Sequence, residues 1–311
     1  MKNKLCLLLV VFLVTVFPTT NYASYNQSSR YSRDGLSLSV APGVLSGESR
    51  EYVYNEDNSL LSQLNWKIKN APIIKGEINY DILPWLTANG RGWSIFTGSR
   101  GSMDDYDWLN PYQAHWTDWS HHENTMLNYA NDIDLNLRGW ILKNQNYKLG
   151  VAAGYEQTAF NFNANGGCYQ YASGHYVGCF ENIPVIGYQQ TFRAPYLGLA
   201  GQFKVDKFEF GALLKISQWV HADDTDNHYL RNLTFREYGT KSKYQSATID
   251  AGYLYSEHTK FFAEASFNHF SEARAGTEII DNDTGEMGYL PNSAGLGNKN
   301  YTFSLGVKYR L

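Results

Sequence analysis

Asp224, Asp226 and His228 occupy alternate positions of one short polar segment, and their residue types could carry acid–base chemistry. Alternate side chains of an extended segment point to the same side, so we expect these three to share one face. A carboxylate two residues from a histidine can orient the imidazole and raise its basicity, as a general base requires. Asp105 and Asp107, far upstream, repeat this spacing. The sequence therefore predicts an acid–base site if the fold brings both segments together.

The chemistry that these residue types suit is the activation of a water molecule. We expect His228 to accept the proton and Asp226 to orient the imidazole. Asp105 and Asp107 would hold the water and share protons, because like charges held close raise the pKa of one carboxyl group. Such a site hydrolyses an acyl bond without a covalent intermediate. On the spacing alone, a solvated acidic loop or a Ca²⁺ site is the more common explanation of the same residues.

Composition favours strands as the elements that position these groups. The chain of 311 residues contains 24 Tyr, 16 Phe, 8 Trp and 27 Gly but only 8 Pro. Aromatic residues and glycine at this level, with few Lys and Glu, suit strands better than helices. The formal net charge of −4 carries no basic excess, so nucleic acid is not an expected partner.

The N-terminus indicates export. Lys2 and Lys4 precede an apolar run at 5–17, and a polar stretch with small residues ends near Ala23. Residues 1–23 therefore read as a signal peptide and 24–311 as the mature chain. The alternative is an N-terminal signal anchor, for which the run is short. No later apolar run reaches the roughly 18–20 residues of a membrane-spanning helix.

Alternation then predicts the fold. Segments such as 36–40, 133–141 and 301–311 alternate apolar with polar residues, and ten such strands can be counted. Their connections alternate between short, near 84, 144, 206 and 257, and long, near 52, 112, 174, 230 and 287. This pattern predicts an all-β, ten-stranded antiparallel transmembrane β-barrel with long extracellular loops and short periplasmic turns. A secreted β-sandwich and a small porin with a lumen filled by Asp132, Asp134, Asn136 and Arg138 are the alternatives.

The two acidic segments fall in the second and fourth long connections. They would therefore meet at the extracellular rim of a narrow barrel. We expect residues 98–125, 163–186 and 223–229 to be irregular loops.

Two cysteines remain after removal of the signal peptide, which contains Cys6. Cys168 and Cys179 flank a segment rich in Gly and Tyr. In an oxidising compartment a disulfide is expected, and two free thiols are the alternative. No further Cys or His stands at ligand spacing, so we expect no metal site.

The chain resembles the omptin family of bacterial outer-membrane aspartate/histidine proteases over essentially its whole mature length. The matching stretches are LSG at 45–47, SQLNWK at 62–67, MDDYDW at 103–108, WTD at 116–118, LNYAN at 127–131, PYLGL at 195–199, SQWV at 217–220 and DTDNHY at 224–229. The resemblance implies a ten-stranded barrel and an outer-membrane endopeptidase that cuts next to Arg or Lys, often between two of them. It implies basic peptides and host proteins as substrates. A non-proteolytic adhesin of the same fold is the alternative.

The resemblance also assigns roles to single residues. The catalytic positions match Asp105, Asp107, Asp226 and His228. The acidic floor of the pocket for the basic side chain matches Glu51 and Asp224, the next subsite matches Asp118, and Asp223 is expected to be solvated. Ser120 and His122 match residues near the site, and we interpret them as supporting because nothing in the sequence places a base beside Ser120.

The resemblance implies no cofactor other than lipopolysaccharide as an activator. Tyr155 matches a tyrosine of the family's lipid-binding patch, whereas the family's glutamate and two arginines are replaced by Gln157, Ala159 and Thr191. Arg193, on the expected face of Thr191, could contact a lipid phosphate instead, as could Lys241. We therefore expect a weaker dependence on lipopolysaccharide.

Overall fold

The structure is a computed structural model that describes residues 35–311, and the predicted signal peptide lies outside them. Nearly all of the described residues are strand. The strands are β1 (Leu36–Tyr54), β2 (Leu60–Leu83), β3 (Leu86–Ile95), β4 (Ser99–Asp107), β5 (Asp118–Lys143), β6 (Tyr147–Tyr171), β7 (Tyr176–Val205), β8 (Phe208–His228), β9 (Leu233–Leu254), β10 (Thr259–Asp281) and β11 (Met287–Arg310), with short 3₁₀ turns η1 (Ala172–Gly174) and η2 (Tyr229–Arg231). None of the helical segments among residues 35–311 is long and apolar enough to cross a membrane.

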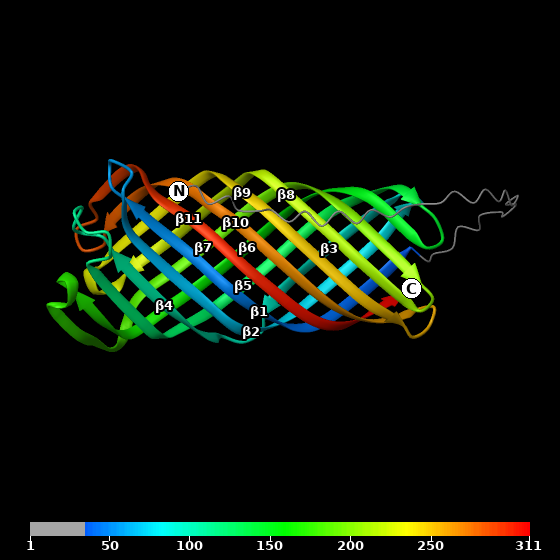
Figure 1. Cartoon of the computed structure of the whole chain (residues 1–311), viewed down its shortest axis with the longest axis horizontal. Helices are drawn as coiled ribbons and strands as arrows, with labels where there is room; N and C mark the ends of the chain where they lie inside the picture. Colours follow the sequence, from blue (N-terminus) through cyan, green and yellow to red (C-terminus); the bar gives the residue numbers. More distant parts are fainter. Residues whose placement is uncertain (1–34) are drawn as a thin grey trace, which may run out of the picture. The chain divides into compact units, whose positions relative to one another are not determined.

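These strands form one closed antiparallel barrel (Figure 1). β1 pairs with β2 on one side and with β11 on the other, which closes the sheet. β3 and β4 both lie between β2 and β5, separated by a break at 96–98, so together they make one barrel strand. Counted this way the barrel has ten strands, and the predicted fold class is confirmed.

Alternation along the strands separates an apolar exterior from a polar interior. On β5 the side chains of Ile133 and Leu135 are exposed, whereas Asp134 and Asn136 are buried inside. On β8 the exposed apolar side chains run from Phe208 to Trp219. His221 and Asp223 follow on the outer side, where the apolar band ends. A bilayer covers such a band in an outer-membrane barrel, so the remaining part of β8 projects beyond the membrane.

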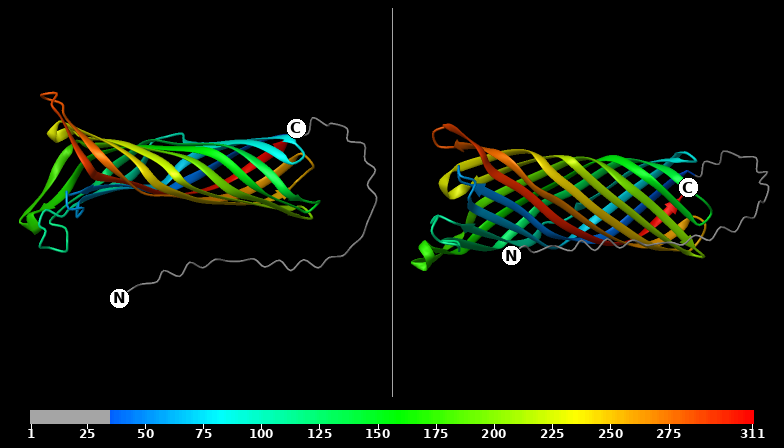
Figure 2. Two further views of the ribbon diagram at one scale, coloured as in Figure 1. Left: turned by 90° about the horizontal axis from the view of Figure 1, so that it is seen from above. Right: turned by 45° about the horizontal axis from the view of Figure 1, so that its top comes forward.

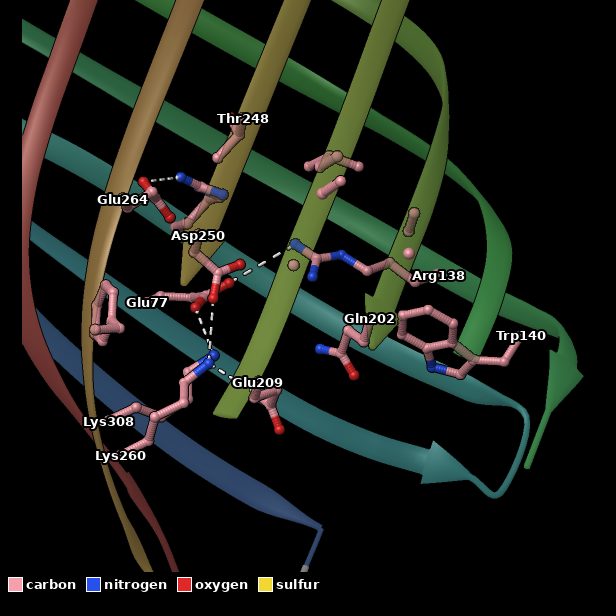
Figure 3. A pocket seen from close by; sticks show the side chains of 17 residues that line it. Glu77, Arg138, Trp140, Gln202, Glu209, Thr248, Asp250, Lys260, Glu264 and Lys308 are labelled. Carbon is pink, nitrogen blue, oxygen red and sulfur yellow. Dashed lines mark hydrogen bonds and ion pairs between the residues drawn. The ribbon is translucent and has the colours of Figure 1, made fainter. Parts of the chain in front are cut away.

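Paired charges fill the interior toward the end of the barrel that carries the short turns. Figure 3 shows Lys260 beside Glu209 and Asp250, and Lys308 beside Glu77. The cavity among these side chains holds only about 40 Å³. This packing does not support the small-porin alternative, because a porin needs a continuous aqueous lumen.

The long connections are mostly hairpin extensions of the strands, so the expectation of irregular loops at 98–125, 163–186 and 223–229 was wrong (Figure 2). The end of the barrel that carries these long hairpins is the hairpin end. Its irregular connections are only 55–59, 108–117, 172–175, 229–232 and 282–286. The short turns lie at 84–85, 144–146, 206–207 and 255–258. Beyond the membrane both faces of a strand can be polar, because one faces water and the other faces the cleft. Apolar alternation therefore stops before the strand does.

An apolar cluster separates the hairpin end from the charged interior. The indole of Trp66 stacks on Tyr188 with ring centroids 5.1 Å apart, and Met103 and Phe162 pack with them in the same buried cluster. Met103 comes directly before the acidic segment of β4. This cluster forms the floor on which the carboxylates of the hairpin end stand.

Candidate active site

One cavity at the hairpin end collects the predicted catalytic residues. It has a volume of about 610 Å³, within the range of ligand-binding clefts. Its charged and polar lining comprises Glu51, Ser62, Asp105, Asp107, Ser120, His122, Tyr171, Asp226, His228, Arg231, Glu237, Thr277 and Ser293. These residues come from strands on both sides of the barrel, as the sequence predicted for the two acidic segments.

Asp226 and His228 lie on the same face of β8 and contact each other. His228 Nε2 donates to Asp226 Oδ2 at 2.6 Å. The guanidinium of Arg231 donates to His228 Nδ1, so the proton of the neutral ring stands on Nε2. Oδ1 of Asp226 is buried without a hydrogen-bond partner among the described residues. Nδ1 is therefore the basic atom of His228, and the exposed Arg231 must move away before Nδ1 can accept another proton.

Asp105 and Asp107 point into the cavity from β4. The hydroxyl of Ser62 donates to Asp105 Oδ1 at 3.2 Å. Burial raises the pKa of Asp105 well above its usual range, and the charge of Asp107 adds to the shift. Burial raises the pKa of Asp107 as well. Two such carboxyls retain a proton at higher pH than isolated aspartates, which suits a pair that hydrogen-bonds to water.

The two acids of the predicted specificity pocket lie together, and a third carboxylate accompanies them. Carboxylate oxygens of Glu51, Asp224 and Glu237 lie within 4.8 Å of one another. Glu51 and Glu237 line the cavity, whereas Asp224 does not line it and contacts the other two acids. The hydroxyl of Tyr188 donates to Asp224 Oδ2 at 2.9 Å. Burial raises the pKa of Glu51 well above its usual range, with the charge of Asp226 as the next cause. Sequence reasoning missed Glu237, because only the pairing of β8 with β9 places it opposite Asp224.

Asp118 lies apart from this group. It pairs with Asp107 in the β4–β5 register but does not line the cavity. Its Oδ1 accepts the backbone N–H of Ala172 at 2.9 Å, so it holds the turn of the β6–β7 hairpin. Its predicted role in a second subsite stays a prediction.

A base does stand beside Ser120, contrary to our interpretation of the sequence. His122 Nδ1 donates to the backbone carbonyl of Gly166 at 2.5 Å, and Ser120 Oγ lies 2.9 Å from His122 Nε2. Burial lowers the pKa of His122, which keeps Nε2 available as an acceptor. Gly167 has φ +112, and a Cβ there would meet the His122 ring at 2.6 Å, so this close approach requires glycine.

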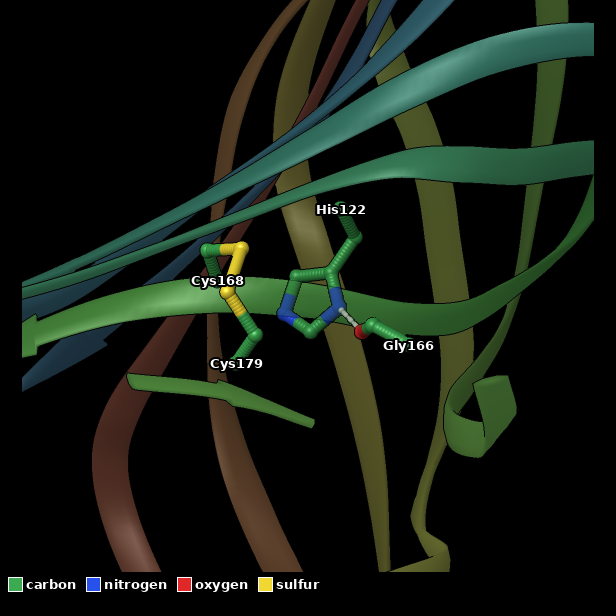
Figure 4. Close-up of a disulfide and its surroundings, with 4 residues drawn as sticks. All are labelled: His122, Gly166, Cys168 and Cys179. Atoms are coloured by element: carbon green, nitrogen blue, oxygen red, sulfur yellow. Dashed lines mark hydrogen bonds between the residues drawn. A yellow bond between two sulfur atoms is a disulfide. The ribbon is translucent and has the colours of Figure 1, made fainter. Parts of the chain in front are cut away.

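A disulfide lies next to this histidine. Cys168 and Cys179 are directly opposite each other on β6 and β7 and are bonded, as predicted (Figure 4). Phe180 stacks on the His122 ring with centroids 5.8 Å apart. The bond thus ties together two strands that form one wall of the cavity.

The candidate lipid-binding residues face outward on β6 and β7. Tyr155 is exposed. Arg193 of β7 is paired with Gln157, which lies two residues after Tyr155 on β6. Arg193 donates to Asp223. The expectation that Asp223 is only solvated was therefore wrong, and Arg193 is partly neutralised on its own surface.

Comparisons with known proteins decide the family. A model described as the Omptin family matches residues 32–311. The chain is 44% identical over 306 residues to the plasminogen activator of Yersinia pestis, covering 97% of this chain and 98% of that protein. The chain belongs to the omptin family. It is also 38% identical over 293 residues to the outer membrane protease OmpP of Escherichia coli K12, covering 91% of this chain and 92% of that one.

A solved structure agrees with this assignment. The crystal structure of the outer membrane protease OmpT from Escherichia coli matches this omptin with a TM-score of 0.88 at 36% identity, covering 92% of this chain and 99% of that one. The predicted family, fold, enzyme class and location are thereby confirmed: this omptin is an outer-membrane protease with a β-barrel fold.

Proposed function

We propose that this omptin is an endopeptidase that cuts next to Arg or Lys, including sites between two basic residues, at the cell surface. The observation that carries the proposal is the arrangement of one cavity. It joins a hydrogen-bonded Asp226–His228 pair to buried carboxylates that have no Lys or Arg partner among residues 35–311. A basic side chain of a substrate would supply the missing cation.

The proposed reaction begins when substrate entry displaces Arg231 from His228. A water held by Asp105 and Asp107 then loses a proton to His228 Nδ1, and its oxygen attacks the scissile carbonyl carbon. Asp226 keeps the ring oriented and stabilises the imidazolium. When the tetrahedral intermediate collapses, the C–N bond breaks and the leaving amine takes the proton from His228. No cofactor enters this sequence.

Substrates and location follow from the same chemistry. Basic peptides and host proteins are the proposed substrates, with the hairpin end facing the cell exterior. Glu51 and Asp224 would bind the basic side chain, and Asp118 would border the next subsite. We also propose lipopolysaccharide as a weak activator that contacts Tyr155 and Arg193. The pairing of Arg193 with Asp223 supports the weakness of this dependence.

The test uses the mature chain refolded with lipopolysaccharide and a quenched fluorogenic peptide that contains Arg-Arg. We expect Asp226→Asn, His228→Ala and Asp105→Asn each to lower kcat/KM by about 10²–10⁴, the usual contribution of acid–base groups. His221→Ala is the matched control, because this histidine lies on the same strand but faces outward. Cleavage that is indifferent to all three substitutions would contradict the mechanism.

Ser120 provides a second mechanism with a specific observation behind it. Its hydroxyl lies 2.9 Å from His122 Nε2, which is the spacing of a nucleophile and its base. If Ser120→Ala removes activity and a covalent acyl-enzyme accumulates in the wild type, the water mechanism is replaced. An adhesin would instead bind host protein with no cleavage by any form.

A further inference from the structure

Glu237 occupies a position that places a third acid in the specificity pocket. On β9 it pairs directly with Asp224 of β8, and Glu51 approaches from β1. The three residues are 1%, 4% and 2% exposed. Like charges opposite each other on neighbouring strands destabilise a sheet.

The free oxygens of this group point to a cationic ligand. Oε2 of Glu51, Oδ1 of Asp224 and Oε2 of Glu237 are all buried without a hydrogen-bond partner in residues 35–311. The other Glu237 oxygen accepts from the hydroxyl of Thr277 at 3.0 Å, which fixes the direction of the carboxylate. A buried acceptor without a donor is costly, so a donor-rich group is expected to complete the set.

No side chain of the described part of the chain supplies that group. None of its salt bridges involves these three carboxylates. The groups that face Glu237 are Asp224, Glu51 and Asp226, all acidic, with the Tyr188 hydroxyl beyond Asp224. Within residues 35–311 a proton shared between Asp224 and Glu237 compensates part of this charge, so a cation that replaces it would come from outside the chain.

We propose that Glu237 is a specificity-determining residue that binds the basic side chain of the substrate together with Glu51 and Asp224. The inference rests on the proposed cleavage next to Arg or Lys. A guanidinium carries five N–H donors in a planar fork and can bond carboxylates along more than one edge. The pocket would thus enclose the substrate cation from three strands.

Before a substrate binds, the acids of this pocket carry a proton. Burial raises the pKa of Glu237 to about 7, and burial together with the charge of Glu237 raises the pKa of Asp224. In the free pocket below about pH 7 the carboxyl of Glu237 is protonated, and Glu51 and Asp224 share the protons of the group because their pKa values are raised too, so entry of a cation must release protons. Binding of a basic side chain should therefore weaken as the pH falls through this range.

The experiment compares two peptides that differ only at the basic position, one with arginine and one with its neutral isostere citrulline. We expect Glu237→Gln to lower kcat/KM for the arginine peptide about 10- to 100-fold, the effect of losing a hydrogen bond between charged groups. Cleavage of the citrulline peptide should change little. Glu237→Asp should retain part of the preference for arginine.

The pH profile separates binding from a structural role. In the wild type the ratio of the two kcat/KM values should rise up to about pH 7, and in Glu237→Gln this rise should become smaller, because Glu51 and Asp224 still titrate with raised pKa values. The control is Glu278→Gln, which removes a carboxylate from an Arg236 pair on the outer surface. Circular dichroism and thermal unfolding confirm that each variant is folded.

Two results would overturn the inference. If Glu237→Gln slows both peptides equally, Glu237 only supports the fold. If neither peptide nor the pH profile responds while His228→Ala abolishes cleavage, Glu237 does not contact the substrate, although the proposed function stands. A wild type that cuts arginine and citrulline peptides equally well would instead contradict the proposed preference for basic residues itself.

Discussion

Lys215→Met tests whether the charges inside the barrel hold it together. Lys215 is 5% exposed on β8, and its ammonium donates to Asp134 Oδ2 at 3.0 Å and to Glu156 Oε2. The hydroxyls of Tyr196 and Tyr244 donate to the same two carboxylates, each at 2.6 Å. Methionine has a similar length and no charge, so the substitution leaves both carboxylates buried without their cation.

The expected loss is large because the remaining partners cannot replace a cation. Removing one member of a buried ion pair costs about 3–5 kcal/mol, since it leaves an uncompensated charge. Two carboxylates depend on Lys215, and the tyrosine hydroxyls offset part of the loss, so we expect about 4 kcal/mol. That corresponds to roughly a thousandfold change in the folding equilibrium.

Urea titration of the refolded barrel in lipid vesicles, followed by tryptophan fluorescence, measures this loss. Lys204→Met is the control, because Lys204 is exposed near a short turn and makes no salt bridge within residues 35–311. We expect the control to lie within about 0.5 kcal/mol of the wild type.

Removing both carboxylate charges should restore the stability that Lys215→Met loses. Lys215→Met combined with Asp134→Asn and Glu156→Gln removes the uncompensated charges, so it should recover most of the stability. A single substitution that costs less than about 1 kcal/mol, or a triple variant no better than the single, would refute the view that pairing of charges stabilises the interior.

Three further predictions concern the hairpin end. Asp105→Asn should stabilise the barrel at pH 7, because a carboxyl with a raised pKa contributes stability only at low pH and loses it as the pH rises; thermal unfolding at pH 7 and 4 should show the gain only at pH 7. Reduction of the Cys168–Cys179 disulfide should change the relative cleavage rates of the peptides in a library several-fold without preventing barrel assembly. Unchanged relative rates would contradict this prediction. Asp223→Asn should release Arg193 and lower the lipopolysaccharide concentration needed for half-maximal activity a few-fold, whereas Arg193→Gln should raise it.

The barrel itself was predictable because every second side chain of a membrane-spanning strand faces the apolar lipid. Residues such as Ile133 and Leu135 must alternate with interior Asp134, and that constraint is visible in the sequence. Above the apolar band this constraint ends, and both sides of a strand accept polar or aromatic residues. The strand continuations at 99–107 and 163–171 therefore carried no apolar alternation and were predicted as loops.

The contact between Ser120 and His122 was not predicted, although residues two apart in an extended segment share a face. Their i, i+2 spacing equals that of Asp226 and His228, so either pair shares a face if its segment is extended. The segment 98–125 carries no apolar alternation, so the sequence alone did not indicate an extended backbone at Ser120. Glu237 is different, since its role depends on strand register, which a single sequence without an apolar pattern does not define.

The two ends of the barrel handle buried charge in opposite ways. Inside the membrane-spanning part, Lys215 and Lys260 each bond two carboxylates of the same chain, so these buried acids have a cation of the chain as their partner. At the hairpin end Glu51, Asp224 and Glu237 lie equally buried, each with one oxygen that has no hydrogen-bond partner and with no Lys or Arg partner in residues 35–311. This contrast between the two ends is why we propose that the unpaired acids above the apolar floor bind the positive charge of a substrate.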